Sequence, residues 1–435
     1  MKQKIIIKNF GPIEDVEMEI NDFAIFIGPQ ASGKSTIAKT VFFFLSLRDD
    51  LMKYLRNAFD DNNFDTPITS LNKIVRNKLT DYFGSVHQTN SNFTLAFFYS
   101  ENVSLSISLD YEDDFVKVVF SDYFEKSLNE EIDFLSIRAN QYHKFDNKFL
   151  TSSELNDIDE QRSNYIKKVK SSLNDLLGFS FEKDLLFIPA GRSAFSALSE
   201  KVQEISSQQF DFLTKDFLKR IDNAKNIFSS YSSNFEDEYN NNEEIFILAQ
   251  KLASDILIGE YFYDNNEGDK IRINNKHYIR LLLASSGQQE AIWIVQMILL
   301  FIDIPQNLFI VIEEPEAHLF PEAQKNMIDL IALLANQNGN QVFITTHSPY
   351  LLTSINNLIY AYQVGEKHPE KVSEIIDKQL WLSPEKIKSY FVGGKDNKGR
   401  IRDIIDEELK IIRVEEIDTA SRINNDKFDQ LFDLT

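Results

Sequence analysis

The amino-terminal segment up to Leu47 has a pattern that predicts three strands followed by a helix. Apolar residues gather in short runs at 4–8, 16–20 and 23–27, separated by polar or charged positions. A glycine-rich turn, 28–33, follows the third run directly, and the apolar spacing then changes to a helical period. The chain therefore opens on strands, and the last of them leads through a tight turn into a helix.

The middle of the chain predicts a second sheet and then mainly helices. Alternating runs with polar turns between them are typical of antiparallel strands, and they lie at 93–99, 103–109 and 115–120. Residues 122–184 and 193–258 are polar and follow a helical period. The Asn/Glu-rich run 234–244 interrupts the second helical region, and we expect it to be a solvated loop.

Strands alternate with helices in the last third of the chain, which predicts a parallel α/β sheet. The expected elements are a hairpin at 261–273, strands at 278–283, 308–312, 341–345 and 358–364, and helices at 288–302 and 321–335. The tail from Glu366 onward is charged, and we expect it to be largely helical.

Composition narrows the choice of partners. The formal net charge is -21, so the surface as a whole repels a phosphate backbone, and DNA binding would need a local basic patch such as Lys167, Lys168 and Lys170. Cysteine is absent, which fits a reducing compartment. The longest apolar stretch, 291–304, is shorter than the roughly 20 residues of a membrane helix, and the amino terminus lacks a signal-peptide pattern. We expect a cytoplasmic protein without a membrane span.

Residues 28–35 match the phosphate-binding pattern G-x-x-x-x-G-K-[ST], between a strand and a helix as that loop requires. Glycines let backbone N–H groups turn toward phosphates, Lys34 reaches the β and γ oxygens, and the Ser35 hydroxyl coordinates magnesium. The alternative is a chance glycine-rich turn. The expected nucleotide contacts are Gly28, Gln30, Ala31, Ser32, Gly33, Lys34, Ser35 and Thr36.

Two adjacent carboxylates, Glu313 and Glu314, end the apolar strand 308–312. Because ligands bind at the carboxyl edge of parallel strands, we expect Glu313 to hold magnesium and Glu314 to accept a proton from the attacking water. The strand 341–345 delivers His347 to the same edge, where it can reach a γ-phosphate. A solvated acidic strand end and a histidine bonded to backbone are the alternatives.

The loop 285–288 resembles the signature loop of ABC-type ATPases, with a serine in place of the first glycine. Alone, such a cluster is typical of a helix cap, but here it lies between the helical region and the carboxylate pair, as in that family. In ABC-type ATPases this loop closes over the γ-phosphate held by the other subunit. The resemblance implies that Ser285, Ser286, Gly287 and Gln288 contact nucleotide in trans, within a head-to-tail homodimer.

The same resemblance assigns further roles. It makes Glu314 the catalytic glutamate, His347 the switch histidine, and 316–319 the loop that crosses the dimer interface. The expected catalytic residues are then Glu314, His347 and Lys34. Glu313 stands where the family usually has aspartate.

The strand 185–189 resembles the one that precedes the glutamine loop of that family, but Ala190 stands where glutamine is expected. Arg192 follows in IPAGRS, which resembles a motif of OLD-like ATPases. Two interpretations stay open: Arg192 binds nucleotide on the γ-phosphate side, or it caps a helix.

Within the ABC superclass, the segments IKNFGPI, IGPQASGKST, IEEPEAHLFP and TTHSPYLL resemble bacterial OLD/RecF-like ATPases, many of which belong to anti-phage systems. The resemblance implies an α/β ABC-type head with a mixed or parallel P-loop sheet, an antiparallel β subdomain and a helical lobe inserted before the signature loop. The expected segments are ATPase core at 1–120 and 281–365, the mainly helical insertion at 121–280, and the helical tail at 366–435.

OLD nucleases carry a Toprim domain after the ATPase, whereas the about 70 residues that follow Val364 are too few for a domain of typical size. The chain therefore resembles the stand-alone ATPase subunits of defence systems such as Septu or PARIS. This implies a switch that uses ATP and Mg²⁺ and controls a separate effector, such as a nuclease. The alternatives are a RecF- or SMC-like DNA-binding repair ATPase and an ATP-bound assembly scaffold with little turnover.

Overall fold

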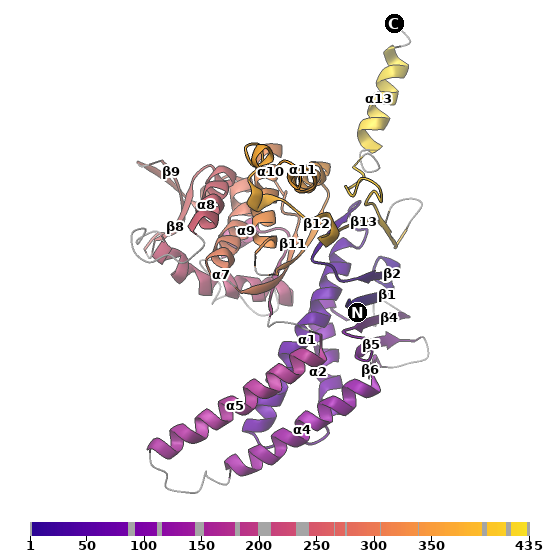
Figure 1. The fold of residues 1–435 in the computed structure, drawn as a ribbon, viewed down its shortest axis with the longest axis vertical. Coiled ribbons are helices and arrows are strands. Elements are labelled where there is room, and N and C mark those ends of the chain that lie inside the picture. The colour runs from indigo at the N-terminus through magenta and orange to yellow at the C-terminus, as the bar shows by residue number, and fades with distance from the viewer. Residues whose placement is uncertain are drawn as a thin grey trace. The chain divides into compact units, whose positions relative to one another are not determined.

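The chain divides into two compact units (Figure 1). Unit 1 comprises Met1–Ile20 and Thr36–Leu185, and unit 2 comprises Asn21–Ser35 and Leu186–Thr435. The computed structural model describes residues 2–85, 92–110, 115–143, 152–178, 183–198, 210–231, 243–264, 266–274, 276–304, 306–337, 339–393, 398–414 and 419–432. The predicted phosphate-binding loop thus lies in unit 2.

Unit 1 is built on a five-stranded antiparallel sheet in the order β2-β1-β4-β5-β6. Its strands are β1 Lys4–Phe10, β2 Ile13–Glu19, β4 Phe93–Phe98, β5 Ser104–Leu109 and β6 Lys117–Phe120. Alternate residues of β5 are buried, beginning at Leu105, so one face of the sheet covers the core. The predicted antiparallel sheet is confirmed, and the first two strands of the chain belong to it.

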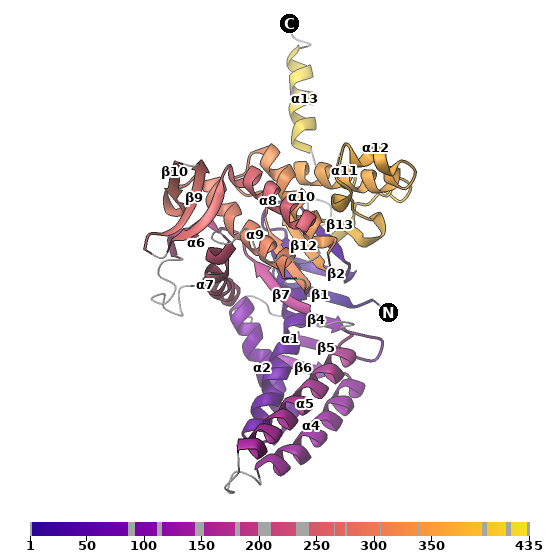
Figure 2. The same ribbon diagram turned by 60° about the vertical axis from the view of Figure 1, so that its left-hand side comes forward.

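Long helices complete the described part of unit 1: α1 Lys34–Asp60, which enters this unit at Thr36, α2 Pro67–Phe83, α4 Asp122–His143 and α5 Ser152–Leu176. Helices α4 and α5 lie side by side as an antiparallel pair (Figures 1 and 2). Across this pair, Lys168 Nζ lies 4.3 Å from the centre of the Phe134 ring, and the Arg138 guanidinium lies 5.3 Å from that of Tyr165. Cations on aromatic faces therefore help to join the two helices.

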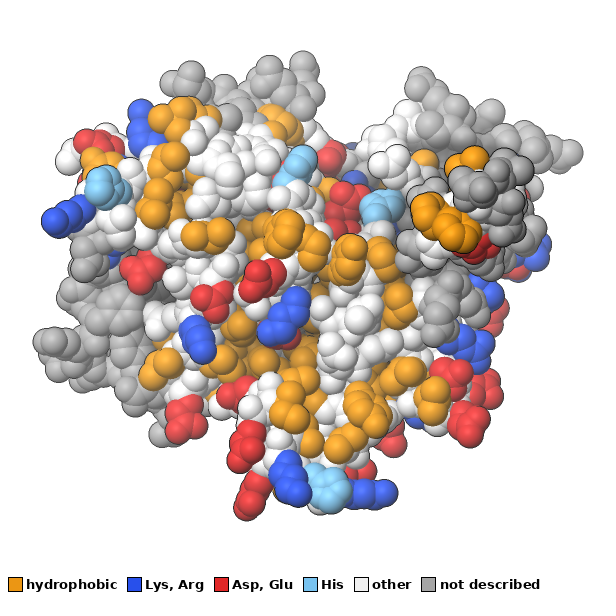
Figure 3. Space-filling view, turned by 90° about the horizontal axis from the view of Figure 1, so that it is seen from above, with side chains coloured by type: hydrophobic (Ala, Val, Ile, Leu, Met, Phe, Trp, Pro, Cys, Tyr) orange, Lys and Arg blue, Asp and Glu red, His pale blue; other side chains and the backbone are white. Residues whose placement is uncertain are grey.

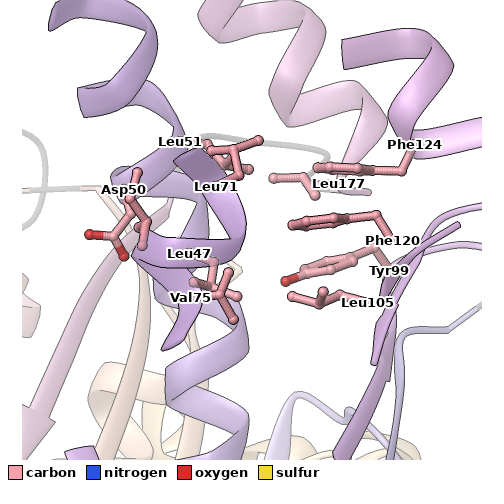
Figure 4. Close-up of a pocket in the computed structure, with 11 residues that line it drawn as sticks. Leu47, Asp50, Leu51, Leu71, Val75, Tyr99, Leu105, Phe120, Phe124 and Leu177 are labelled. Carbon is pink, nitrogen blue, oxygen red and sulfur yellow. The ribbon is translucent and has the colours of Figure 1, made fainter. Parts of the chain in front are cut away.

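An apolar cavity of about 20 Å³ lies inside unit 1 (Figure 4). Side chains from α1, α2 and the sheet line it, among them Leu47, Leu51, Val75, Tyr99, Leu105 and Phe120. A space of this size holds about one water molecule, but water needs polar partners that an apolar wall does not provide.

Unit 2 contains the larger part of a six-stranded sheet in the order β14-β13-β3-β12-β11-β7. Its strands are β3 Phe23–Ile27, β7 Lys183–Ile188, β11 Asn307–Glu313, β12 Gln341–Thr346, β13 Ile387–Val392 and β14 Ile401–Asp403. The pairs β13–β3, β3–β12 and β12–β11 are parallel, whereas β14 runs antiparallel to β13. Parallel pairing brings the carboxyl ends of β3, β11 and β12 to one edge. Together with the antiparallel sheet of unit 1, this confirms the predicted α/β fold class.

Helices of unit 2 separate β7, β11, β12 and β13 in the sequence (Figure 2). The helices of this unit are α6 Ser193–Leu198, α7 Phe212–Tyr231, α8 Glu243–Leu257, α9 Ser286–Asp303, α10 Pro321–Ala335, α11 Pro349–Gly365, α12 Pro369–Ser373 and α13 Thr419–Phe432. A small antiparallel sheet, β10-β9-β8, comprises β8 Glu260–Asp264, β9 Gly268–Asn274 and β10 His277–Arg280. No helix in the described ranges combines the length and the apolar character that crossing a membrane requires.

The predicted strand at 358–364 is wrong, because these residues lie within α11. The apolar positions Leu351, Leu352, Ile355, Leu358 and Ile359 are all buried and recur at helical spacing. The short run LIYAYQV resembles a strand only when it is separated from the residues before it.

Two more expectations need correction. The tail is not largely helical, because β13 and β14 lie in it and β13 pairs with β3 in the main sheet. The strand expected at 278–283 ends at Arg280, and residues 281–283 form a 3-10 turn. Of the Asn/Glu-rich run 234–244, residues 234–242 lie outside the described residues, and the last two begin α8.

Candidate nucleotide-binding site

The phosphate-binding loop follows β3 and packs against the end of the tail strand β13. A Cβ atom built on Gly28 would lie 2.2 Å from the carbonyl oxygen of Val392, so no other residue fits there. A Cβ on Gly393 would lie 2.8 Å from Cβ of Ser32. The tail strand therefore fixes the position of the loop, a contact that the sequence did not indicate.

Lys34 is buried at the start of α1 and points back into the loop. Its Nζ donates hydrogen bonds to the carbonyl oxygens of Gly28, at 2.9 Å, and Pro29, at 2.8 Å, and lies 3.5 Å from Nδ1 of His347. Burial lowers the pKa of Lys34 to about 8, against the opposing effect of nearby carboxylates, chiefly that of Glu314. The positive charge of this ammonium is therefore poorly compensated without an anion.

Glu314 and His347 meet at the carboxyl ends of β11 and β12. Glu314 Oε1 lies 3.2 Å from Nε2 of His347, and the Glu314 backbone N–H donates to the Thr345 carbonyl at 2.8 Å. Glu314 has a φ of 45°, an unusual left-handed conformation for a residue other than glycine. The structure thus brings the three predicted catalytic residues, Lys34, Glu314 and His347, into one cluster.

Glu313 is more deeply buried than Glu314, with 5% of its surface exposed. Its Oε2 accepts a hydrogen bond from the Ala190 N–H at 3.2 Å, whereas its Oε1 is buried without a partner in the described ranges. A buried carboxylate oxygen without a donor is the kind of atom that a magnesium ion or its water completes. Ser35 is exposed in the first turn of α1, so both predicted metal residues fit Mg²⁺.

Protein side chains alone would not fill such a metal site. In the described part of the chain, no group of three or more His, Cys, Asp or Glu residues is placed to hold a metal ion. Magnesium usually keeps several waters and takes phosphate oxygens in addition to one or two protein ligands. Ser35 and Glu313 are enough under that arrangement.

Glu316 connects the loop after β11 to the loop after β12. Its Oε1 accepts hydrogen bonds from the Thr346 hydroxyl and the His347 backbone N–H, both at 2.7 Å. Its Oε2 is buried and has no partner among the described residues. The carboxylate therefore sets the position of His347, a role that the sequence did not indicate.

The predicted signature loop forms the start of α9. Ser285 is its N-cap, and the Ser285 hydroxyl and Gln288 make a reciprocal capping box. Ser285 and Ser286 are exposed, and a Cβ on Gly287 would lie 2.8 Å from the carbonyl oxygen of His318. An exposed helix amino terminus attracts anions, so the helix-cap reading and the nucleotide reading are compatible.

Exposed apolar side chains lie near this loop in the sequence and the fold. Leu283, two residues before Ser285, is 70% exposed, and Phe320, two residues after His318, is 76% exposed.

Arg192 is fully buried and is not placed to bind nucleotide. Its guanidinium donates to the backbone carbonyls of Pro189, Glu290, Glu313 and Glu314, at 2.6 to 2.9 Å. Burial lowers its pKa, and the carboxylate of Glu290 opposes that effect most strongly. The helix-cap interpretation holds for the backbone of Arg192, because this residue directly precedes α6 and its carbonyl accepts the Phe195 N–H at 2.9 Å. The side-chain acceptor at this helix start is the Glu290 carboxylate, which binds the N–H groups of Arg192 and Ser193. No sequence signal indicated Glu290, since buried and exposed acids look alike in a helix.

Comparisons with known proteins identify the family to which the chain belongs. The family model described as AAA ATPase domain matches residues 1–352. Among curated proteins, the lipoprotein-releasing system ATP-binding protein LolD of Neorickettsia sennetsu is 28% identical over 112 residues, which are 26% of this chain and 43% of LolD. The match thus spans less than half the length of that relative.

Solved structures with some likeness are heads of SMC proteins. The SMC head bound to the C-winged helix domain of ScpA is 12% identical, with 92% of this chain and 96% of that chain covered and a TM-score of 0.41. The SMC head domain from Thermotoga maritima has 12% identity, coverage of 93% and 98%, and a TM-score of 0.36. The Pyrococcus furiosus Smc head with an extended coiled coil, bound to the C-terminal domain of ScpA, has 13% identity, coverage of 92% and 95%, and a TM-score of 0.37.

Proposed function

Because this chain belongs to the AAA ATPase domain family, we propose that it is an ATP-hydrolysing switch whose nucleotide sites are completed when two copies meet head to tail. The observation that carries the proposal is the contact series from Lys34 through His347 to Glu314, with separations of 3.5 and 3.2 Å. A cation that binds phosphate oxygens and a carboxylate that can accept the proton of water are groups that phosphoryl transfer to water uses, and the histidine lies between them.

Each residue of the cluster has a separate task in this proposal. Lys34 exchanges its bonds to loop carbonyls for the β- and γ-phosphate oxygens. Glu314 accepts the proton of the water that attacks the γ-phosphorus. His347, held at its backbone by Glu316, contacts the γ-phosphate and orients Glu314. Ser35 and Glu313 would hold Mg²⁺, which when bound neutralises charge on the phosphates.

The second copy supplies the anion-binding end of α9. The exposed Ser285 and Ser286 with Gly287 and Gln288 would meet the γ-phosphate bound by the partner's phosphate-binding loop. The exposed Leu283 and Phe320 would be covered by the same contact. Burial of such side chains contributes roughly 25 cal/mol per Å² of apolar surface to association.

Trapping the dimer tests this proposal. Glu314→Gln keeps the shape of the site and removes the base, so light scattering should give twice the monomer mass with ATP and the monomer mass with ADP or without nucleotide. The double variant Glu314→Gln/Lys34→Ala is the matched control, and we expect it to stay monomeric with ATP. A monomeric Glu314→Gln protein at saturating ATP would refute the head-to-tail site.

The proposal includes a separate effector protein such as a nuclease. It rests on the resemblance of IEEPEAHLFP and TTHSPYLL to ATPases of anti-phage systems. Cells that carry this chain with its genomic neighbour should survive phage infection, whereas cells with the Glu314→Gln chain should not. Equal survival of both strains would show that ATP hydrolysis by this chain is not needed for defence.

DNA as the direct partner is less favoured. On the face drawn in Figure 3, the described basic side chains lie singly or in small groups among acidic ones. Lys168, from the predicted basic cluster, packs on Phe134. A steep loss of duplex binding with rising salt would favour the DNA-clamping alternative.

A further inference from the structure

Arg192 contacts the two peptide groups that flank Glu314. One terminal nitrogen, Nη1, donates to the Glu313 carbonyl at 2.6 Å, and the other, Nη2, donates to the Glu314 carbonyl at 2.8 Å. The first carbonyl belongs to the peptide that precedes the Glu314 Cα atom and the second to the peptide that follows it. Holding both peptide planes fixes φ and ψ of Glu314, and therefore the direction in which its side chain leaves the backbone.

This fixation matters because Glu314 has a φ of 45°. A side chain other than glycine stays in that conformation only when its surroundings require it. The N–H of Glu314 bonds to the Thr345 carbonyl, and the carbonyl of Glu314 also accepts from the Ala317 N–H at 3.1 Å. Arg192 is the charged member of this set, and a rigid, planar donor group suits two carbonyls at once.

The same guanidinium is bonded to the helix that begins with the signature loop. Arg192 Nε donates to the Glu290 carbonyl at 2.9 Å, and Nη2 lies 3.5 Å from Glu290 Oε2. Glu290 is 2% exposed and lies in the second turn of α9. With the bond from Nη1 to the Pro189 carbonyl at 2.8 Å, the guanidinium donates four hydrogen bonds to backbone carbonyls and is also paired with the Glu290 carboxylate.

We propose that Arg192 and Glu290 form a positioning pair, which sets the backbone conformation of Glu314 and connects it to the helix that carries the signature loop. The pair touches no substrate and acts through Glu314. The inference rests on the proposed function, and it adds that a shift of α9, when the partner's nucleotide docks on it, changes the direction of the catalytic carboxylate in the same chain.

The decisive variant is Arg192→Lys. Lysine keeps the charge opposite Glu290 but is a single donor centre, so it cannot hold the Glu313 and Glu314 carbonyls together. We expect kcat to fall at least tenfold while the Kd for ATP stays within threefold of wild type. If charge pairing in the core were all that Arg192 provides, Arg192→Lys would restore wild-type kcat, and the inference would be wrong.

A second buried ion pair in unit 2 gives the matched control. Lys225 Nζ lies 2.9 Å from Asp269 Oδ2, and both residues are 5% exposed. The exchange Lys225→Arg makes the reverse change of shape at a buried cation, away from the strand ends. We expect its kcat to equal that of wild type at equal folded fraction. A tenfold loss in Lys225→Arg as well would show a general effect of buried cations and overturn the assignment.

Should Arg192→Lys fold poorly, Glu290→Gln tests the same pair. An amide keeps one of the two oxygens that accept the N–H groups of Arg192 and Ser193, and it removes the countercharge of Arg192. We expect a lower kcat, by about threefold to tenfold, with unchanged ATP affinity. Unchanged kcat in a fully folded Glu290→Gln protein would contradict the proposal, as would a loss of ATP affinity as large as the loss of kcat.

Hydrogen exchange separates this inference from the proposed function. The Glu314 amide should exchange at least tenfold faster in Arg192→Lys than in wild type, and equally in Lys225→Arg and wild type. This readout needs no ATP turnover. A wild-type chain that hydrolyses no ATP would refute the proposed function, and faster exchange would still support the positioning pair. Unchanged exchange in Arg192→Lys would refute the pair alone.

Discussion

The carboxyl edge of the parallel sheet in unit 2 and the apolar interior of unit 1 treat their polar groups differently. At the sheet edge, four buried side-chain atoms have no partner among the described residues: Ser32 Oγ, Glu313 Oε1, Glu316 Oε2 and Thr345 Oγ1. Around the cavity of unit 1, the Tyr99 hydroxyl donates to the Phe44 carbonyl at 2.7 Å, and Asp50 is paired with Lys78. Elsewhere in unit 1, Asn72 Oδ1 and Asn174 Oδ1 are buried without a partner among the described residues, but they are single atoms and not a group of four at one place.

An unpartnered buried polar atom costs free energy, about 1 to 3 kcal/mol in typical cases. A protein keeps several of them at one place where a ligand completes them. The contrast therefore supports the proposed nucleotide site at the sheet edge of unit 2, and we expect the interior of unit 1 to contribute to stability. Substitutions in the two regions should change different measured quantities.

The largest expected effect is that of Glu314→Gln on hydrolysis. Removing a general base typically lowers kcat by 10²- to 10⁴-fold, and we expect about 10³-fold in single-turnover ATP hydrolysis. The matched variant is Asp50→Asn in unit 1, which removes the charge of a carboxylate that lines the cavity and should leave kcat unchanged. Similar losses in both variants would remove the distinction between the two regions.

The next effect is on stability. Leu105 is 2% exposed and lines the cavity of unit 1 (Figure 4). Leu105→Ala should lower the free energy of unfolding by about 2 to 5 kcal/mol, because it enlarges an existing void. Denaturant unfolding measures the loss, and kcat per folded molecule should stay at the wild-type value. A reduced kcat at full folding would show that the interior of unit 1 also sets the geometry of the site.

The sequence predicted the candidate site residues at the carboxyl ends of the parallel strands well, because each of them follows an apolar run or the loop after it. Glu313 is the last residue of β11, and His347 directly follows β12. Lys34 begins α1, after the loop that follows β3. The expected position of Glu314 and His347 at one edge of the sheet follows from parallel pairing. At these positions, the local sequence pattern alone indicates where the residue lies in the sheet.

Residues that act through tertiary contacts could not be predicted. Glu290 lies in the helical run GQQEAIW, and nothing local distinguishes its 2% exposure from that of a solvated glutamate. For Arg192 the sequence left two interpretations open, nucleotide binding and helix capping. It could not show the contacts that decide its role, because three of its four carbonyl acceptors, those of Glu290, Glu313 and Glu314, lie 98 to 122 residues away in the chain. The strand β13 was missed because its partner β3 belongs to the other end of the chain.

A smaller effect is the pH dependence of ATP affinity. Burial lowers the pKa of Lys34 to about 8 in the free protein, and bound phosphates favour the charged ammonium and raise that pKa. Above pH 8 the free protein has lost the proton that the complex keeps, so binding takes up a proton. The Kd for ATP should therefore rise with pH above 8, by up to about tenfold per pH unit.

Calorimetry in two buffers with different heats of ionisation measures this proton uptake directly. Wild type should take up part of a proton on binding ATP at pH 8.5, and Lys34→Arg should take up none, because arginine stays charged. Equal uptake in both proteins would place the titrating group elsewhere in the site.

The smallest effect concerns the cavity of unit 1. Val75 is 3% exposed and lines it from α2, and isoleucine adds one methylene without changing the branching at Cβ. Filling a void of about 20 Å³ should raise the free energy of unfolding by about 0.5 kcal/mol, at roughly 24 cal/mol per Å³.

The control variant is Val41→Ile in α1, where the valine is fully buried and does not border this cavity. Overpacking there should lower stability by about 1 to 3 kcal/mol. Both substitutions add the same methylene. A change in the free energy of unfolding that is positive in Val75→Ile and negative in Val41→Ile would locate the packing defect at the cavity, and changes of equal sign would place it elsewhere in the core.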